Sequence, residues 1–241
     1  MTSNSSLFKF KQFSISQTNA AMKVGTDGVL LGAWTPVEDV KRALDVGAGT
    51  GLIALMMAQR NPYLDVTALE VDAGAYSDAK ENFANSPWTD RLHLIHTRFQ
   101  NFTADIYGQF DAIVCNPPFF EDGCHAPQSQ RAIARHTLTL SSYDLLKGAY
   151  NLLCEEGDLS VVLPFISYHS FSQEAKKNLF YERRRLLVYP TPHKKAVRVL
   201  SVWTKFKVDE VIEEEMVIEE NGRHNYSAEY KELTKKFYLK F

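Results

Sequence analysis

The stretch "FDAIVCNPPFF" at 110–120 places an amide, two prolines and two aromatic rings directly after a hydrophobic run. A proline fixes its own φ, restricts the residue before it and donates no N–H, so we expect the Pro117 carbonyl to be rigid and outside helix or sheet ladders. With the side-chain oxygen of Asn116 it forms two fixed acceptors. An exocyclic amine has two N–H donors that match them. Phe119 adds a flat surface on which a base can stack.

This arrangement predicts transfer of an activated group to a planar amino nitrogen. Hydrogen bonds from the amine to Asn116 and Pro117 favour the pyramidal nitrogen and free its lone pair, and positioning for in-line attack supplies much of the rate. We therefore predict Asn116, Pro117 and Phe119 as catalytic residues. A stiff turn without chemistry is the alternative, because Asn-Pro is also a common turn initiator.

A second chemical signal lies upstream in "LDVGAGTGLIAL" at 44–55. Gly47, Gly49 and Gly51 separate an expected strand from an expected helix, where glycines allow a sharp turn and close approach of a ligand. Glu70 lies 19 residues after Gly51, at the end of the next expected strand. A carboxylate at that position accepts hydrogen bonds from ribose hydroxyls, so the spacing predicts a nucleoside-bearing cofactor.

The charge around the glycines indicates which cofactor binds. Asp45 precedes the first glycine by two residues, and Leu52 stands where a dinucleotide fingerprint has its third glycine. A pyrophosphate prefers free N–H groups at a helix N-terminus, whereas an acid here suits a cation. S-adenosylmethionine carries an ammonium and a sulfonium and no phosphate, so we predict it as the cofactor. A nicotinamide dinucleotide and a turn without any ligand are the alternatives.

These residues require a sheet whose strands end at one edge. Alternating strand and helix patterns predict a doubly covered, mostly parallel sheet of α/β class. Two consecutive strands near the C-terminus break the alternation and predict an antiparallel hairpin at its edge. The seven expected strands are 42–47, 65–72, 91–96, 110–115, 158–164, 183–190 and 197–208, and the principal helices are 27–34, 52–60, 73–86, 141–157 and 168–180.

The domain organisation follows from length and pattern. A chain of 241 residues suits one domain, here 1–241. Residues 7–16 alternate and predict a short strand or hairpin, so residues 1–35 form an expected N-terminal appendage and 36–241 the core. Ser141 and Asp144 predict the cap of the helix that we expect to end at Gly157.

Composition narrows the function further. Hydrophobic residues make up 45% and charged residues 23% of the chain, as in ordinary globular proteins. No apolar run is long enough for a membrane span, and no signal-peptide pattern begins the chain. The three cysteines, Cys115, Cys124 and Cys154, are widely spaced, which argues against disulfides and a metal site and for inert thiols in the cytoplasm.

Charge is unevenly distributed along the chain. Residues 176–207 hold ten Lys or Arg and one acid, whereas 209–220 hold seven acids and no base. Cations against phosphates give most nucleic-acid affinity, so the basic stretch predicts an RNA surface. The acidic run is an expected solvated loop facing away from the RNA. The candidate RNA-binding residues are Arg131, Arg135, Arg183, Arg184, Arg185, Lys194, Lys195 and Arg198.

The order "LDVGAGTG", Glu70 and "NPPF" resembles class I S-adenosylmethionine-dependent methyltransferases that modify planar amino groups. "GTDGVLLGAW" at 25–34, "RAIARH" at 131–136 and the ending "YKELTKKFYLKF" are similar to one branch, the tRNA valine (adenine-N6) methyltransferase family. This resemblance implies a Rossmann-like fold and methylation of the adenosine at position 37 in the anticodon stem-loop of a valine tRNA.

The resemblance also implies roles for individual residues. Asp45, Gly47, Gly49 and Gly51 belong to the cofactor-binding turn, Thr26 holds the cofactor carboxylate, Glu70 holds the ribose and Phe99 flanks the adenine. Asn116 contacts both cofactor and target. Arg98 stands where such enzymes usually carry an acid, and because arginine accepts no hydrogen bond, Gln100 or a backbone carbonyl is the expected substitute.

Three other functions share these motifs. A protein glutamine N5-methyltransferase also uses Asn-Pro-Pro with an aromatic residue, because an amide nitrogen is equally planar. A ribosomal RNA adenine or guanine N-methyltransferase is a second alternative, although many of those enzymes carry an extra domain. An inactive RNA-binding protein is the third. The basic stretch favours RNA over a peptide substrate.

Overall fold

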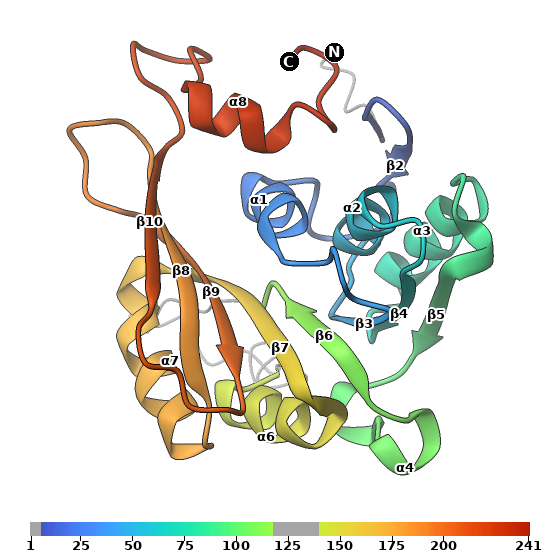
Figure 1. Ribbon diagram of the computed structural model, residues 1–241. Helices are drawn as coiled ribbons and strands as arrows, with labels where there is room; N and C mark the ends of the chain where they lie inside the picture. Colours follow the sequence, from blue (N-terminus) through green and yellow to red (C-terminus); the bar gives the residue numbers. More distant parts are fainter. Residues whose placement is uncertain (1–5, 118–139) are drawn as a thin grey trace, which may run out of the picture.

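The computed structural model of the protein describes residues 6–117 and 140–241. Two sheets are present in this part of the chain. A small antiparallel hairpin joins β1 (Leu7–Lys9) to β2 (Ser14–Ser16), as the alternating pattern predicted. The main sheet has eight strands in the order β10-β8-β9-β7-β6-β3-β4-β5. Helices cover both of its faces (Figure 1).

The elements follow the predicted alternation closely. The strands of the main sheet are β3 (Arg42–Val46), β4 (Asp65–Glu70), β5 (Leu92–His96), β6 (Phe110–Cys115), β7 (Leu153–Pro164), β8 (Tyr181–Tyr189), β9 (Arg198–Thr204) and β10 (Ile212–Val217). The helices are α1 (Thr26–Trp34), α2 (Leu52–Arg60), α3 (Ala73–Ala84), α4 (Ala104–Tyr107), α6 (Ser142–Leu152), α7 (Phe165–Lys177) and α8 (Ala228–Thr234), with the short 3-10 turns η1 (Thr89–Arg91) and η2 (Phe99–Asn101).

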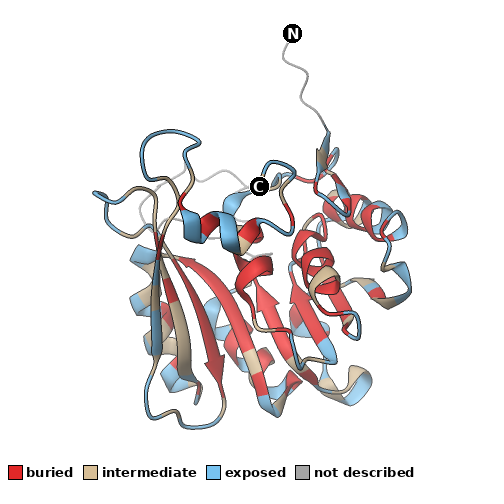
Figure 2. Ribbon diagram, turned by 45° about the horizontal axis from the view of Figure 1, so that its top comes forward, coloured by how far each residue is buried: buried red, intermediate tan, exposed pale blue. Residues whose placement is uncertain are grey.

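The core has two halves, one on each face of the sheet, because side chains of a strand alternate between faces. Ala112 and Val114 of β6 join the cluster under α1 and α2, whereas Ile113 and Cys115 join the cluster under α6 and α7. The central strands are buried on both faces (Figure 2). Burial on both faces explains their continuous hydrophobic runs.

Strand order reverses between β3 and β6. The chain moves outward from β3 through β4 to β5 and then returns to the other side of β3 with β6. These two strands are parallel, and Val46 lies opposite Cys115. Residues 47 and 116 therefore leave the sheet side by side at the carboxyl edge, where open α/β sheets bind their ligands.

The predicted fold class is confirmed, but the sheet has eight strands rather than seven. The acidic run predicted as a solvated loop contains β10, which pairs in parallel with β8 and takes the edge of the sheet. Only β9 runs antiparallel to its neighbours, so the predicted hairpin of β8 and β9 lies one strand inside the edge. Glutamates are depleted in strands, which explains why the composition of this run indicated a loop.

The helix predicted from Ser141 is shorter than expected. The Ser141 hydroxyl accepts from the Asp144 N–H at 3.0 Å, as a capping residue does. The helix ends at Leu152, however, and β7 begins with the next residue. Gly157 is part of β7, where an added Cβ would lie 3.0 Å from the Phe110 carbonyl oxygen, so close strand packing explains this glycine.

The N-terminal hairpin packs onto the main body of the molecule. Phe10, Phe13 and Ile15 are buried in the same cluster as α1 and α2. The Lys11 N–H donates to the Phe237 carbonyl at 2.8 Å, which links the hairpin to the segment after α8. The division into an appendage, 1–35, and a core, 36–241, stays a prediction.

Strand β10 neutralises the basic strand beside it. The Arg184 guanidinium donates from Nε to Glu214 Oε2 at 2.7 Å and from Nη2 to Oε1 at 3.1 Å. It also lies 4.5 Å from the centre of the Trp34 ring on α1. The hydrogen bonds from Arg184 lower the pKa of Glu214. The pair therefore ties the edge strand to both its neighbour and α1.

We expect this pair to stabilise the fold measurably. Arg184→Met and Glu214→Gln should each lower the free energy of unfolding by about 1–2 kcal/mol, with a coupling of about 1 kcal/mol in the double variant. Urea unfolding of the four proteins measures this coupling. Glu210→Gln, an exposed carboxylate without an ion pair in the described chain, is the control. Purely additive single effects would show that the pair contributes nothing.

Candidate active site

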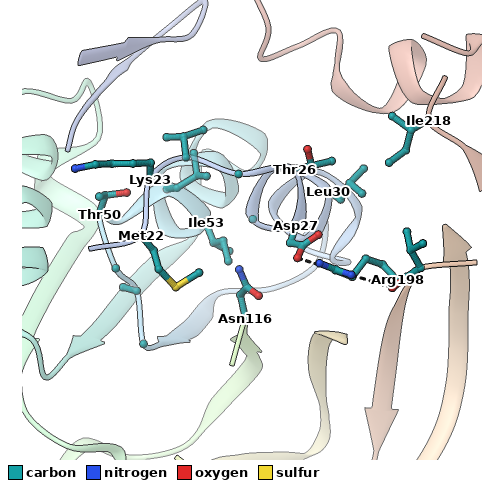
Figure 3. Close-up of a pocket in the computed structure, with 18 residues that line it drawn as sticks. Met22, Lys23, Thr26, Asp27, Leu30, Thr50, Ile53, Asn116, Arg198 and Ile218 are labelled. Atoms are coloured by element: carbon teal, nitrogen blue, oxygen red, sulfur yellow. Dashed lines mark hydrogen bonds and ion pairs between the residues drawn. The ribbon is translucent and has the colours of Figure 1, made fainter. Parts of the chain in front are cut away.

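A cavity of about 440 Å³ opens at the carboxyl edge of β3 and β6. Its walls come from distant parts of the sequence, and Figure 3 shows them gathered around Asn116. One wall is the segment before α1 with the first turn of that helix, a second is the glycine turn with the start of α2, and a third contains Val197, Arg198 and Ile218. The sequence-predicted residues that line it are Thr26, Gly47, Gly49, Asn116 and Arg198.

The glycine turn presents bare backbone to this cavity. Gly47 and Gly49 have φ of 72° and 59°, which favours glycine, and a Cβ at either residue would meet no atom within 4 Å. Both glycines line the cavity, so the open space beside them is ligand space. A flat cofactor can therefore approach the chain closely here.

Gly51 has a different reason for being glycine. Its φ is 82°, and an added Cβ would lie 2.4 Å from a carbon of the Phe83 ring on α3. It directly precedes α2. It does not line this cavity, nor a second cavity, of about 60 Å³, that is described below. The packing of α2 against α3 accounts for this glycine, so we propose no cofactor contact for it.

Glu70, the last residue of β4, is hydrogen-bonded to the glycine turn. Its Oε2 accepts from the Gly49 N–H at 2.7 Å, and its Oε1 accepts from the Val71 and Asp72 N–H groups at 2.7 Å each. A carboxylate has about four acceptor sites, so one remains for a hydroxyl. The predicted ribose contact stays a prediction, and the structure adds a second role, which is to hold the turn.

Asp45 is an incompletely bonded acid in the interior. One oxygen accepts from the Ala54 N–H on α2 at 3.1 Å, whereas Oδ1 is buried without a hydrogen-bond partner in the described chain. Burial raises the pKa of Asp45 to about 7, the Ala54 N–H opposes the shift, and the charge of Glu70 adds to it. An orphaned buried carboxylate oxygen fits a cationic ligand nearby.

Residues 16–24, here called the strap, contribute Met22, Lys23 and Val24 to the cavity wall and are hydrogen-bonded to α3. Asn82 donates to the Ser16 carbonyl and to the Thr50 carbonyl of the glycine turn, each at 2.9 Å. Asp78 accepts from the Asn19 and Ala20 N–H groups at 2.8 Å. Both side chains are buried. These bonds fix the strap relative to the turn and so position Thr26 at the head of α1.

A smaller cavity of about 60 Å³ lies on the other side of Gly47. Phe99, Arg98 and Gln100 line it, together with Thr97 and residues from the ends of β3 and β4. Gly47 thus separates two cavities, one on each side of the turn. The predicted contact of Phe99 with the cofactor adenine stays a prediction.

Asn116 is partly buried, and its side chain extends from the end of β6 into the large cavity (Figure 3). Pro117 is also partly buried. Phe119 lies outside the described residues, as do Arg131 and Arg135. Gly47 and Asn116 lie together because Val46 and Cys115 pair in the sheet.

The predicted basic surface divides into paired and unpaired cations. Arg183 is paired with Asp158, Arg184 with Glu214, and Arg185 with Glu182 and Glu213. Lys194 and Lys195 are exposed in the turn between β8 and β9 and have no ion pair with a described residue. This turn leads into Val197 and Arg198 on the cavity wall.

Asp27 is a candidate site residue that the sequence did not predict. It lines the cavity, and its Oδ2 accepts from Arg198 Nε at 2.8 Å, as Figure 3 shows. The pair holds a guanidinium on the wall of the cavity opposite the glycine turn. The only sequence signal was an acid inside "GTDG", whose partner lies 171 residues away.

Both cysteines among the described residues have thiols with a raised pKa. Cys115 is buried, and burial raises the pKa of its thiol, with the charge of Asp45 adding to the effect. Burial and Asp111 raise the pKa of Cys154. In residues 6–117 and 140–241, no group of three or more His, Cys, Asp or Glu is placed to hold a metal ion, and no helix is long and apolar enough to cross a membrane.

A glycine turn and an Asn-Pro end at the switch point of a largely parallel sheet define a Rossmann-like methyltransferase, and the methyl donor of this class is S-adenosylmethionine. A family model described as methyltransferase small domain matches residues 21–179. A tRNA1(Val) (adenine(37)-N6)-methyltransferase from Bacteroides fragilis is 46% identical over 234 residues, 97% of this chain and 98% of the relative. The enzyme of the same name from Flavobacterium psychrophilum is 43% identical over 235 residues, 97% and 100% of the two chains.

The chain therefore belongs to the tRNA1(Val) (adenine(37)-N6)-methyltransferase family, as its motifs predicted. Solved structures agree on the fold. A predicted O-methyltransferase from Agrobacterium tumefaciens superposes with a TM-score of 0.67 at 19% identity, covering 88% of this chain and 96% of that one. A putative RNA methyltransferase from Pyrococcus horikoshii gives 0.52 at 16% identity, with 74% and 82% covered.

The raised pKa of Asp45 predicts pH-dependent cofactor binding. A cationic ligand favours the ionised carboxylate, so the affinity for S-adenosylmethionine should rise from about pH 6 to about pH 8, with proton release on binding. Without cofactor, a rise in pH has the opposite effect on the free energy of unfolding. The stability that Asp45 contributes is fully present below its usual pKa of 3.8 and is lost as the pH rises through about 7.

Titration calorimetry in buffers of different ionisation enthalpy measures both the affinity and the protons released. Asp45→Asn should bind the cofactor more weakly and with little pH dependence over the same range. A variant that keeps the wild-type pH profile would show that another group carries the proton.

Proposed function

We propose that this chain transfers the methyl group of S-adenosylmethionine to N6 of adenosine 37 in a valine tRNA, and that it does so in the cytoplasm. Relatives that carry this name match the chain over 97% of its length. The observation that carries the proposal is the position of Asn116, beside the exposed backbone of Gly47 and Gly49 in one cavity.

The glycine turn and its neighbours would hold the cofactor. Gly47 and Gly49 offer backbone without side chains, Thr26 at the head of α1 takes the carboxylate, and Asp45 compensates positive charge from the interior. Glu70 uses its remaining acceptor site for the ribose, and Phe99 lies against the adenine. When bound, the cofactor supplies a methyl group on a positively charged sulfur that is already activated towards a nucleophile.

Asn116 and Pro117 act on the target amine. Their two oxygens accept its two N–H groups, which draws the nitrogen out of conjugation with the ring and directs its lone pair towards the cofactor side of the cavity. The target amine is neutral, so it needs no strong base before the methyl transfer, and the methylated nitrogen would release one proton to solvent afterwards. Phe119 would stack on the adenine and hold its plane.

The RNA would reach the cavity over the turn between β8 and β9. An anticodon-loop base is already unpaired, so turning it into a pocket costs less than in a duplex. Lys194 and Lys195 are exposed and unpaired within the described chain. Arg198 lines the cavity, with Nε donating to Asp27 and Nη1 to the Val197 carbonyl. Arg183, Arg184 and Arg185 serve the sheet through ion pairs instead.

Nucleoside analysis tests the reaction directly. The protein is incubated with labelled S-adenosylmethionine and unmodified valine tRNA transcript, and the product is digested to nucleosides. Label in N6-methyladenosine at position 37 is expected. Label in ribosomal RNA or in protein glutamine, offered in the same assay, would instead support one of the alternative substrates.

Asn116→Ala should lower the rate of methyl transfer at least about a hundredfold, because the amine loses one fixed acceptor and its alignment. The affinity for the cofactor should stay within about threefold of wild type. Single-turnover kinetics and calorimetry measure the two quantities. Asn85→Ala, an exposed amide at the end of α3, is the matched control. Turnover near the wild-type rate would exclude Asn116 as the amine-holding group.

Reversing both charges in Lys194→Glu/Lys195→Glu should weaken tRNA binding about tenfold and flatten its salt dependence. Filter binding at several salt concentrations measures both effects. Lys41→Glu/Lys207→Glu carries the same charge change at the opposite edge of the sheet and should bind like wild type. Equal loss in both variants would indicate a general charge effect rather than contact at the turn.

A further inference from the structure

A second and larger groove, of about 910 Å³, adjoins the candidate active site. The hairpin strand β1, the chain between β10 and α8, α8 itself and the last four residues form its walls. Thr26 and Ile218 line this groove and the catalytic cavity alike. A ligand that extends from the cavity past Thr26 or Ile218 would therefore enter the groove.

The groove has an aromatic wall. The rings of Tyr226 and Tyr230 stack at 5.1 Å, and Phe241 meets Tyr226 at 5.2 Å and Tyr238 at 5.4 Å. Tyr230 is buried, whereas Tyr226, Tyr238 and Phe241 keep partial exposure. Partly exposed aromatic rings that pack on a buried ring can stack on an unpaired nucleobase of any type.

This wall is held in place by the fold rather than left as a loose tail. Lys11 Nζ donates to the carbonyls of Lys235 at 2.6 Å and Phe241 at 2.5 Å, which fastens the C-terminal segment to the hairpin. The Ser227 hydroxyl caps α8 by accepting from the Tyr230 N–H at 3.0 Å. The Ser227 N–H donates to the Ile218 carbonyl, at the boundary between groove and cavity.

The groove also carries free positive charge. Lys9, Lys231 and Lys240 line it and are exposed, and none of them has an ion pair or side-chain hydrogen bond with a described residue. Among the described residues on its walls, Glu219 is the one with an acidic side chain, and its Oε1 accepts from the His224 N–H at 2.7 Å. The arginines of β8 are, by contrast, neutralised by carboxylates.

We infer that this groove binds the nucleotides next to the methylated adenosine in the RNA. The inference rests on the proposed function and adds a place for the flanking strand. The aromatic rings stack an unpaired neighbouring base, and Lys9, Lys231 and Lys240 contact the phosphates on either side of it. An acidic peptide would match the lysines, but it has no flat ring to use the aromatic wall.

Charge reversal in the groove tests this placement. Lys231→Glu/Lys240→Glu should bind an anticodon stem-loop of valine tRNA about tenfold more weakly than wild type, with a salt slope shallower by about two. The effect should be the same for the full-length transcript, because the groove adjoins the target nucleotide. Lys41→Glu/Lys207→Glu is the matched control, and calorimetry with S-adenosylmethionine should give wild-type affinity for both variants.

Photocrosslinking supplies a test that needs no variant. A stem-loop carrying 5-iodouridine beside the target adenosine is irradiated with the wild-type protein, and the attached peptide is identified by mass spectrometry. Attachment to a segment that lines the groove, 8–9, 218–219 or 224–241, is expected. Attachment elsewhere in the chain would overturn the inference.

These outcomes distinguish a failure of the proposed function from a failure of the groove inference. If wild-type protein leaves the transcript unmethylated, the proposed function fails and the groove inference fails with it. If wild type methylates the transcript and the groove variant binds the stem-loop as tightly as the control variant, the groove inference alone is wrong. Weakened binding of full-length tRNA with unchanged binding of the stem-loop would also overturn it, because the contact would then lie far from the target base.

Discussion

The pairing of Val46 with Cys115 is the constraint on which the site depends. It places the end of β3 beside the end of β6, so that Gly47 and Asn116 emerge together although 69 residues separate them. A shift of one residue would turn each strand's buried side chains to the opposite face. The two hydrophobic half-cores therefore enforce the same register that brings the backbone for the cofactor and the amide for the target into one cavity.

Polar groups in the interior complete this geometry. Glu70 holds Gly49, Asn82 holds Thr50, and Asp78 holds the strap in front of the cavity. Each of these side chains bonds backbone groups that would otherwise be unsatisfied when buried. Asp45 differs from these three side chains, because its Oδ1 is buried without a hydrogen-bond partner in the described chain and burial raises the pKa of its carboxyl to about 7. A bound cation would favour the ionised carboxylate, whereas burial without the cation favours the protonated form.

Local signals were readable from the sequence, and long-range pairings were not. The Ser141 cap, the glycine turn and the strand before Asn116 depend on neighbours in the chain, and each lies where its pattern predicted. The partner of Arg184 depends on how β10 pairs with β8 across 30 residues, which no local pattern specifies. Gly51 illustrates a subtler limit: its presence was noticed, but its reason is the Phe83 ring on another helix.

The direction of β9 explains why Arg198 lies at the carboxyl edge of the parallel strands. Parallel strands end at the carboxyl edge, so a strand running the other way begins there. Arg198 is the first residue of β9 and therefore stands at the edge where β3 and β6 end, and the turn with Lys194 and Lys195 precedes it at the same edge. The parallel strand β10 ends at that edge too, and the next residue, Ile218, separates the cavity from the groove under α8. The three strands beyond β7 thus extend the sheet, and the turn before β9 places Lys194 and Lys195, which have no ion pair with a described residue, at the edge where β3 and β6 end.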